Sequence, residues 1–340
     1  MRIALPIICA CCTVLFAACK NQKTETPSVA EYHAAQDSGV QSAGIQMIPI
    51  ETPVGKFKVW TKRIGNNPRI KVLLLHGGPA MTHEYMECFE SFFPKEGIEF
   101  IEYDQLGSYY SDQPTDSSLW TTERFVEEVE QVRKALGLTK DNFFLLGNSW
   151  GGILAMEYAL KYQQNLKGLI IANMMASAPD YALYNLKLQE QMDKNTIDSI
   201  MLLQNQGKTS DPRFMQLLQG YYDEHLCRIT PNPDPVQRSF KHANMTIYTM
   251  MQGPSEFGIS GRLANWDIKS RLKEISVHTL TIGAKHDTMD PEHMEWMSKQ
   301  MPKGEYLYCP NGSHLAMWDD QQTFMNGVIQ FIHKTDKAAK

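Results

Sequence analysis

The chain has 340 residues, of which 43% are hydrophobic and 21% are charged, and its formal net charge is -5. This is globular composition, sufficient for one large domain or two smaller ones. The acidic balance and the lack of a long basic run exclude the usual pattern of a nucleic-acid-binding protein. The seven cysteines show neither a disulfide framework nor zinc-ligand spacing, so we expect free thiols or at most one bridge in the mature chain.

The first residues differ from the rest of the chain. Residues 1–18 combine a short basic start with an apolar run, the pattern of a secretory signal rather than of a membrane span. Residues 15–19 read Leu-Phe-Ala-Ala-Cys, which resembles a bacterial lipobox. We therefore expect 1–18 to be a lipoprotein signal peptide and Cys19 to carry the lipid.

This N-terminus also predicts where the protein resides. Residues 19–44 are rich in Ser, Thr, Gln, Glu and Ala, which favours a flexible tether. We expect a protein of the bacterial cell envelope, on the periplasmic or outer-membrane side, that contacts the membrane through its lipid anchor alone. A plain signal peptide and a soluble secreted or periplasmic protein is the alternative.

Beyond the tether, strand and helix patterns alternate. Short apolar runs bounded by turn residues predict strands, the first two of which form an antiparallel hairpin. Apolar residues recurring every three to four positions predict helices. The predicted strands are 47–50, 56–60, 70–75, 98–103, 143–146, 166–172, 277–282 and 305–308, and the predicted helices include 122–136, 151–161 and 319–334. This alternation predicts an α/β fold with a mostly parallel, doubly wound sheet.

The alternation is interrupted between residues 176 and 268. This block contains helical stretches, such as 184–192 and 214–226, and no convincing buried strand. We interpret it as a helical cap inserted after the sixth strand, over the carboxyl ends of the strands, where open α/β sheets bind ligands. The predicted core then has a first part, 45–175, and a second part, 269–340.

Residues 147–152, Gly-Asn-Ser-Trp-Gly-Gly, lie between an apolar strand and a helix. Strand, Gly-x-Ser-x-Gly and helix in this order are the nucleophile elbow of an α/β-hydrolase. The tight turn strains the serine backbone and requires glycine two residues before and after it. The turn exposes the hydroxyl at a helix N-terminus, whose dipole favours negative charge. The sequence therefore predicts an α/β-hydrolase fold with Ser149 as nucleophile.

A serine nucleophile needs a base, and the base needs an acid that orients it. In α/β-hydrolases the chain order is serine, acid, histidine. Asp287 follows the predicted strand 277–282, and His314 follows the last predicted strand. We expect these residues to be the acid and the base, with Asp290 as the alternative acid. Two other histidines, His286 and His293, precede the last strand, which is the wrong place for the base.

An oxyanion hole must also be present. One donor is expected to be the backbone N–H of Trp150, directly after the nucleophile. The second is expected from residues 76–80, His-Gly-Gly-Pro-Ala, where Gly78 is favoured and Gly77 is the alternative. This chemistry requires neither a metal nor an organic cofactor.

Several motifs together resemble the proline iminopeptidase family. They are His-Gly-Gly-Pro at 76–79, Asp-Gln-Leu-Gly-Ser at 104–108, the elbow at 147–152, Asp-x-x-x-Pro at 287–291 and Gly-Ser-His at 312–314. The cap segment 251–257, Met-Gln-Gly-Pro-Ser-Glu-Phe, is similar to the tricorn-interacting aminopeptidase branch. The resemblance covers roughly residues 45–335 and implies a capped α/β-hydrolase that removes N-terminal residues, often proline.

Two positions depart from the family pattern. Ala80 occupies a position where the family usually has glycine. The family's usual Gly-x-Gly-x-Ser is here 107–111, Gly-Ser-Tyr-Tyr-Ser, with two bulky tyrosines. These departures concern the substrate rather than the type of reaction.

The resemblance also implies how the substrate is recognised. A free α-amine is largely protonated near neutral pH, and a carboxylate in a poorly solvated pocket binds it strongly. Glu256 matches the family's amine-binding glutamate, and Glu224 is a second candidate. For both, a solvated charge on a helix face is the alternative. Trp150 and aromatic residues of the cap are expected to form apolar walls for a proline ring.

These observations favour a serine aminopeptidase acting on short peptides with a free N-terminus. An α/β-hydrolase for a small ester, lactone or amide is the alternative, because cap residues vary while the sheet stays constant. A non-catalytic binding lipoprotein is a third hypothesis, and the complete set of Ser149, Asp287 and His314 argues against it.

Overall fold

The computed structural model describes residues 43–338. The predicted signal peptide, residues 1–18, and the predicted lipid attachment site, Cys19, lie outside the described residues, as does almost all of the predicted tether. Residues 43 and 44, which were assigned to the tether, belong to the first strand of the sheet. Within 43–338, no helix combines the length and the apolar character that crossing a membrane would require.

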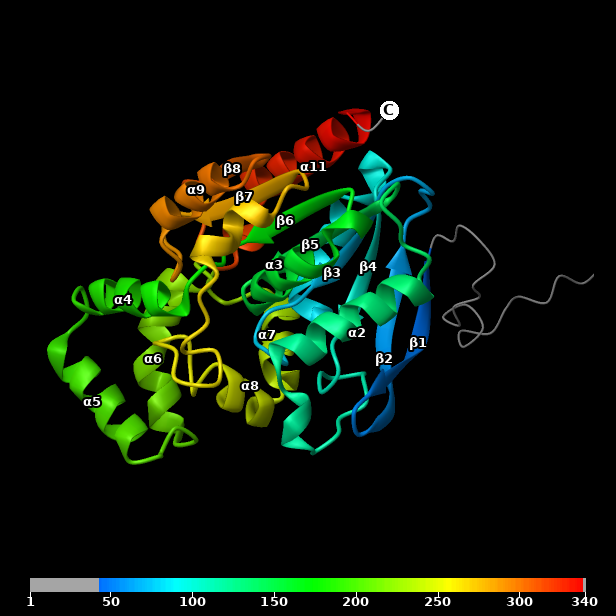
Figure 1. Cartoon of the computed structure of the whole chain (residues 1–340). Helices are drawn as coiled ribbons and strands as arrows, with labels where there is room; N and C mark the ends of the chain where they lie inside the picture. The colour runs from blue at the N-terminus through cyan, green and yellow to red at the C-terminus, as the bar shows by residue number, and fades with distance from the viewer. Residues whose placement is uncertain (1–42, 339–340) are drawn as a thin grey trace, which may run out of the picture.

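One eight-stranded sheet runs through the molecule in the order β1-β2-β4-β3-β5-β6-β7-β8 (Figure 1). Its strands are β1 Ala43–Thr52, β2 Gly55–Ile64, β3 Lys71–Leu75, β4 Glu99–Asp104, β5 Phe143–Asn148, β6 Gly168–Ala172, β7 Thr279–Ala284 and β8 Gly304–Cys309. The β1–β2 hairpin is antiparallel, and β2 pairs antiparallel with β4. All further neighbours are parallel, which confirms the predicted mostly parallel sheet.

Helices cover both faces of the sheet, as Figure 1 shows for α2 and α3 on one side and α11 beyond the other. The core helices are α2 Thr122–Ala135, α3 Trp150–Tyr162, α9 Pro291–Gln300, α10 Ala316–Asp319 and α11 Gln321–Ala338, with the 3-10 helices η1 His83–Ser91, η2 Pro94–Glu96, η3 Ser117–Leu119, η4 Gln163–Asn165 and η5 Lys269–Glu274. Leu73 and Leu75 of β3 enter one hydrophobic core, and Val72 and Leu74 enter the other. Because both faces are buried, a central strand must be apolar throughout.

Between β6 and β7 the chain forms the helical cap. Its helices are α4 Ala178–Gln189, α5 Lys194–Asn205, α6 Pro212–His225, α7 Asp234–His242 and α8 Met245–Met251. Helices α4, α5 and α6 project away from the sheet at one end (Figure 1) and have a small core of their own around Ile200, Phe214 and Leu218. An isolated antiparallel bridge between Ser177 and Asp267 joins the two ends of the cap.

Candidate active site

The turn between β5 and α3 holds Ser149 in a strained conformation. Its φ of 57° and ψ of -127° lie in a region that residues with a side chain rarely adopt. A Cβ on Gly147 would lie 1.9 Å from the carbonyl oxygen of Gly151, and a Cβ on Gly151 would lie 2.1 Å from that of Leu75. Only glycine fits at both positions, so the chain forms the nucleophile elbow that the motif predicts.

The structure brings His314 and Asp287 together. His314 Nδ1 lies 2.7 Å from Asp287 Oδ1, and both side chains are buried. Asp287 also accepts hydrogen bonds from Asn173 Nδ2 at 2.7 Å and from the backbone N–H of Met289 at 3.1 Å. Because an ionised carboxylate can only accept, the proton of a neutral His314 resides on Nδ1. This leaves Nε2 with a lone pair for accepting a proton.

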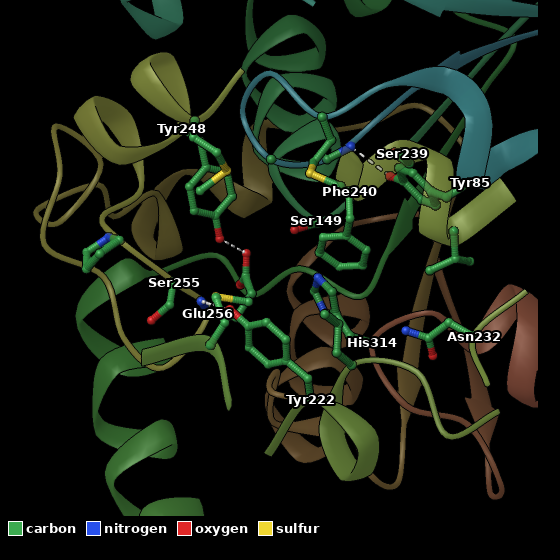
Figure 2. Close-up of a pocket in the computed structure, with 18 of the residues that line it drawn as sticks. Tyr85, Ser149, Tyr222, Asn232, Ser239, Phe240, Tyr248, Ser255, Glu256 and His314 are labelled. Carbon is green, nitrogen blue, oxygen red and sulfur yellow. Dashed lines mark hydrogen bonds between the residues drawn. The ribbon is translucent and has the colours of Figure 1, made fainter. Parts of the chain in front are cut away.

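Ser149 and His314 line the same pocket, and Figure 2 shows the imidazole of His314 next to Ser149. Among the described residues, which include both, no hydrogen bond joins the side chains of Ser149 and His314. Such bonds are often long without substrate and tighten when the substrate binds. The arrangement is therefore compatible with a serine–histidine–aspartate triad.

Several charges act on the imidazole of His314. Burial lowers its pKa, but the charge and the hydrogen bond of Asp287, together with the charge of Glu256, outweigh this effect and raise the pKa above its ordinary value. The surrounding carboxylates therefore stabilise the imidazolium that forms when the ring takes up a proton.

In the loop after β3, the free amide of Gly78 belongs to a residue that lines the pocket with Ser149. The backbone N–H of Gly77 donates to the hydroxyl of Tyr85 at 2.7 Å, which removes Gly77 as an oxyanion donor. The amides of Gly78 and Trp150 have no acceptor among the described residues. Ala80 adopts a φ of 62°, a left-handed conformation that favours glycine, and this accounts for the glycine usual at that position in the family.

Two residues to which the sequence assigned no role hold this loop in place. The hydroxyl of Tyr85 donates to Asn148 Oδ1 at 2.9 Å, next to the nucleophile. Gln105 accepts from Trp150 Nε1 at 2.8 Å and donates to the carbonyl of His76 at 3.0 Å. Gln105 lies in the quoted motif at 104–108, whereas no local pattern distinguishes Tyr85 from other tyrosines.

A cavity of about 680 Å³ between cap and core contains Glu256 together with Ser149 and His314 (Figure 2). Glu256 is 8% exposed, and its carboxylate accepts hydrogen bonds from the hydroxyls of Tyr248 and Tyr181. Burial and the charge of Glu256 raise the pKa of both tyrosines, so both remain protonated donors. They fix a carboxylate at the wall of the pocket.

The structure separates the other predicted candidates from the pocket. Glu224 does not line it, because its side chain is half exposed and pairs with His286 Nδ1 at 2.8 Å. The geometry therefore gives no support to Glu224 as a second amine ligand. Asp290 caps α9 by accepting from the backbone N–H of Glu292 at 2.9 Å, and His314 Nδ1 contacts Asp287 rather than Asp290. His293 accepts from a backbone amide at the entry to the cap.

The described part of the chain offers no evident metal site. Within 43–338, no group of three or more His, Cys, Asp or Glu side chains is suited to hold a metal ion. Cys88, Cys227 and Cys309 are buried free thiols.

The elbow, the paired histidine and aspartate, and the capped sheet define an α/β hydrolase. Residues 71–321 match the family described as alpha/beta hydrolase fold. The proline iminopeptidase of Flavobacterium johnsoniae is 69% identical over 289 residues, which cover 84% of this chain and 97% of that protein. The proline iminopeptidase of Elizabethkingia meningoseptica is 66% identical, over 85% of this chain and 98% of that protein.

A solved structure gives the same result. The crystal structure of the proline iminopeptidase of Mycobacterium smegmatis superposes with a TM-score of 0.76 at 29% identity, covering 86% of this chain and all of that one. The chain belongs to the proline iminopeptidase family of α/β hydrolases, which confirms the prediction made from its motifs.

Proposed function

We propose that this protein is a serine aminopeptidase that releases the N-terminal residue, preferably proline, from short peptides. The observation that carries the proposal is the position of Glu256, whose buried carboxylate lines the same pocket as Ser149 and His314. A protonated N-terminal amine is the group that such a carboxylate binds most strongly. At an internal peptide bond the corresponding nitrogen is an uncharged amide and offers no such charge.

In the proposed complex, Glu256 binds the substrate amine. Tyr222 and Tyr248 line the pocket beside Glu256 (Figure 2), and their rings provide an apolar wall that suits a proline side chain. This clamp places the first carbonyl carbon at Ser149 and explains cleavage at the chain end alone.

In acylation, His314 Nε2 accepts the proton of Ser149 Oγ as the oxygen attacks the first carbonyl carbon. The amides of Gly78 and Trp150 donate to the developing oxyanion. Asp287 orients the imidazole and offsets its positive charge. The imidazolium then protonates the departing amine, and the C–N bond breaks to leave an acyl-enzyme.

In deacylation, water takes the place of the leaving peptide. His314 accepts a proton from the water as its oxygen attacks the ester carbonyl. The tetrahedral intermediate collapses, Ser149 Oγ receives the proton back, and the free amino acid leaves.

A pair of substrates tests the amine clamp. Proline arylamide with a free amine should be hydrolysed, whereas its N-acetyl derivative should be hydrolysed at least about a hundredfold more slowly, because the charge that Glu256 binds is missing. Equal turnover of the two, with faster turnover of short esters, would assign the protein to the ester, lactone or amide hydrolases instead.

A matched pair of variants tests the residue. Glu256→Gln should lower kcat/KM for proline arylamide by about a hundredfold, since a charge-assisted contact in a desolvated site is lost. Glu224→Gln, the same change in the half-exposed carboxylate of the same cap, should stay within about twofold of wild type. Equal losses of kcat/KM in both variants would contradict the role of Glu256 in binding the substrate amine.

We further propose that the mature protein is a lipoprotein of the cell envelope, anchored through Cys19 and otherwise free of the membrane. The support is the apolar run of residues 1–18 followed by Ala-Ala-Cys and a polar segment. In a bacterial host, labelled palmitate should be incorporated into the wild-type protein but not into Cys19→Ala, which should appear in the soluble fraction. Labelling that survives this substitution would contradict the anchor.

A further inference from the structure

The pocket continues past the nucleophile. In Figure 2, Glu256 and Tyr248 lie on one side of Ser149 and His314, and Phe240 and Asn232 lie on the other. All of them line the same cavity of about 680 Å³, a volume that holds a ligand larger than one amino acid. The site therefore has space for substrate on both sides of the scissile bond.

The far side of the cavity is uncharged. Helix α7 contributes the apolar Val236 and Phe240 and the neutral polar Gln237 and Ser239. The adjacent wall contains Met81, Leu226 and Leu315. Val236, Leu226 and Leu315 are buried, whereas Phe240 is 38% exposed at the rim. Among the described residues, no lysine or arginine lines the cavity. Apart from tyrosines, the ionisable residues that line it are Asp211, Glu256 and His314, and none of these three belongs to α7.

The one arginine of α7 is turned away from this wall. The guanidinium of Arg238 lies 2.6 Å from a carboxylate oxygen of Glu84 and 2.6 Å from one of Glu87, both on η1, and 2.8 Å from Asp234. Helix α7 therefore directs Arg238 to the core, and these ion pairs hold the helix in that orientation. Its other cationic residue, Lys241, is exposed and does not line the cavity.

We propose that the α7 side of the pocket binds the residue that follows the scissile bond, and that it selects an uncharged apolar residue there. The inference rests on the proposed aminopeptidase function: with the amine at Glu256 and the first carbonyl at Ser149, the leaving peptide is directed to the α7 side. A charged second side chain would lose water there without gaining a partner of opposite charge on α7. The carboxylate of a free dipeptide would meet no cation either.

A set of amidated dipeptides, all with N-terminal proline, tests this preference. With leucine in second place, kcat/KM should exceed that with glycine by about tenfold or more, because a desolvated apolar side chain discriminates by that amount. Aspartate and lysine should fall below glycine. Prolyl-leucine with a free carboxylate should be cleaved more slowly than its amide.

Phe240→Ala tests the residue at the rim. It should reduce the leucine-to-glycine ratio of kcat/KM at least about threefold. Phe240→Leu should retain most of the ratio and guards against a loss caused by misfolding. Leu202→Ala, which removes an exposed apolar side chain of α5 outside the pocket, should leave the ratio unchanged.

The outcomes separate the two proposals. Cleavage of every peptide at similar kcat/KM, or an unchanged ratio in Phe240→Ala, would overturn the α7 subsite and leave the aminopeptidase function intact. Failure to cleave any peptide with a free amine would overturn both.

Discussion

The backbone N–H of His314 donates a 3.0 Å hydrogen bond to the carbonyl of His225, the last residue of α6. The ring of the same His225 donates from Nδ1 to the carbonyl of His286 at 2.8 Å. His286 directly precedes Asp287 in the chain. One residue of the cap therefore contacts the loop of the base and the loop of the acid, so the cap and the catalytic pair are positioned together.

Replacing the ring of His225 should affect turnover more than binding. His225→Ala keeps the backbone bond to His314 but loses the bond to His286, which should cost about 1 kcal/mol of the free energy of unfolding. We expect kcat for proline arylamide to fall several-fold with little change in KM. His333→Ala, at a partly exposed histidine of α11, is the control, and equal kcat values in the two variants would contradict the role.

The strained backbone of Ser149 predicts an unusual order of stability. Ser149→Ala and Ser149→Gly should both lose activity, because the nucleophile is gone. Glycine adopts a positive φ without strain, so Ser149→Gly should be more stable than Ser149→Ala by about 1 kcal/mol. Denaturant unfolding of the two inactive proteins measures the difference, and a more stable alanine variant would show that the turn is relaxed.

The raised pKa of His314 predicts the acid limb of the pH profile. A protonated imidazole cannot accept the Ser149 proton, so kcat/KM should fall as the pH drops through the pKa of His314, above 6.5. Asp287→Asn should move this limb to lower pH, since the charge that raises the pKa is removed, and should lower the plateau by about 10³-fold to 10⁴-fold. Asp290→Asn should change neither feature, because asparagine also caps a helix. A limb that stays in place in Asp287→Asn would exclude this pairing.

A buried carboxylate outside the site predicts a pH-dependent stability. Burial raises the pKa of Glu102 to about 7, and the ammonium group of Lys62, 3.4 Å away, opposes this shift. Neither carboxylate oxygen has a hydrogen-bond donor among the described residues. The folded state therefore holds the proton of Glu102 more tightly than the unfolded state does. The stabilisation that this proton gives is complete below about pH 4.5 and is lost as the pH rises toward 7.

Glu102→Gln should remove this penalty. The difference in unfolding free energy between the variant and wild type should be more favourable to the variant at pH 8 than at pH 5, by on the order of 1–3 kcal/mol. Urea unfolding at both pH values gives the difference. Glu90→Gln, at the exposed partner of the same lysine, should not show it, and an identical response of the two variants would refute the explanation.

The sequence could predict the sheet and the tight turn at Ser149 because both rest on local patterns. The apolar run at 70–75 and the elbow at 147–152 are such patterns, and β3 and β5 lie where these predict them. The β1–β2 hairpin extends well beyond its predicted strands, to Ala43 and Ile64. The residues beyond the predicted strands lie near an edge of the sheet. Polar side chains are tolerated there, so the sequence lacks the apolar pattern that predicts a strand.

Contacts between distant segments could not be predicted in this way. Tyr85 acts through Gly77 and Asn148, and only the folded chain brings it beside the elbow. Glu224 and Glu256 are both carboxylates of the cap, and only the folded chain shows that Glu256 lines the pocket while Glu224 pairs at the surface. Local sequence patterns cannot distinguish them, because Glu224 lies in α6 and Glu256 in a turn after α8, and their positions depend on how the cap packs onto the core.

The bridge between Ser177 and Asp267 has an evolutionary consequence. An inserted segment whose two ends meet at one junction can be exchanged by recombination as a single block, without shifting the strands that precede Ser149, Asp287 and His314. Lineages can thereby acquire new substrates through the inserted segment while inheriting an unchanged reaction from the scaffold beneath it.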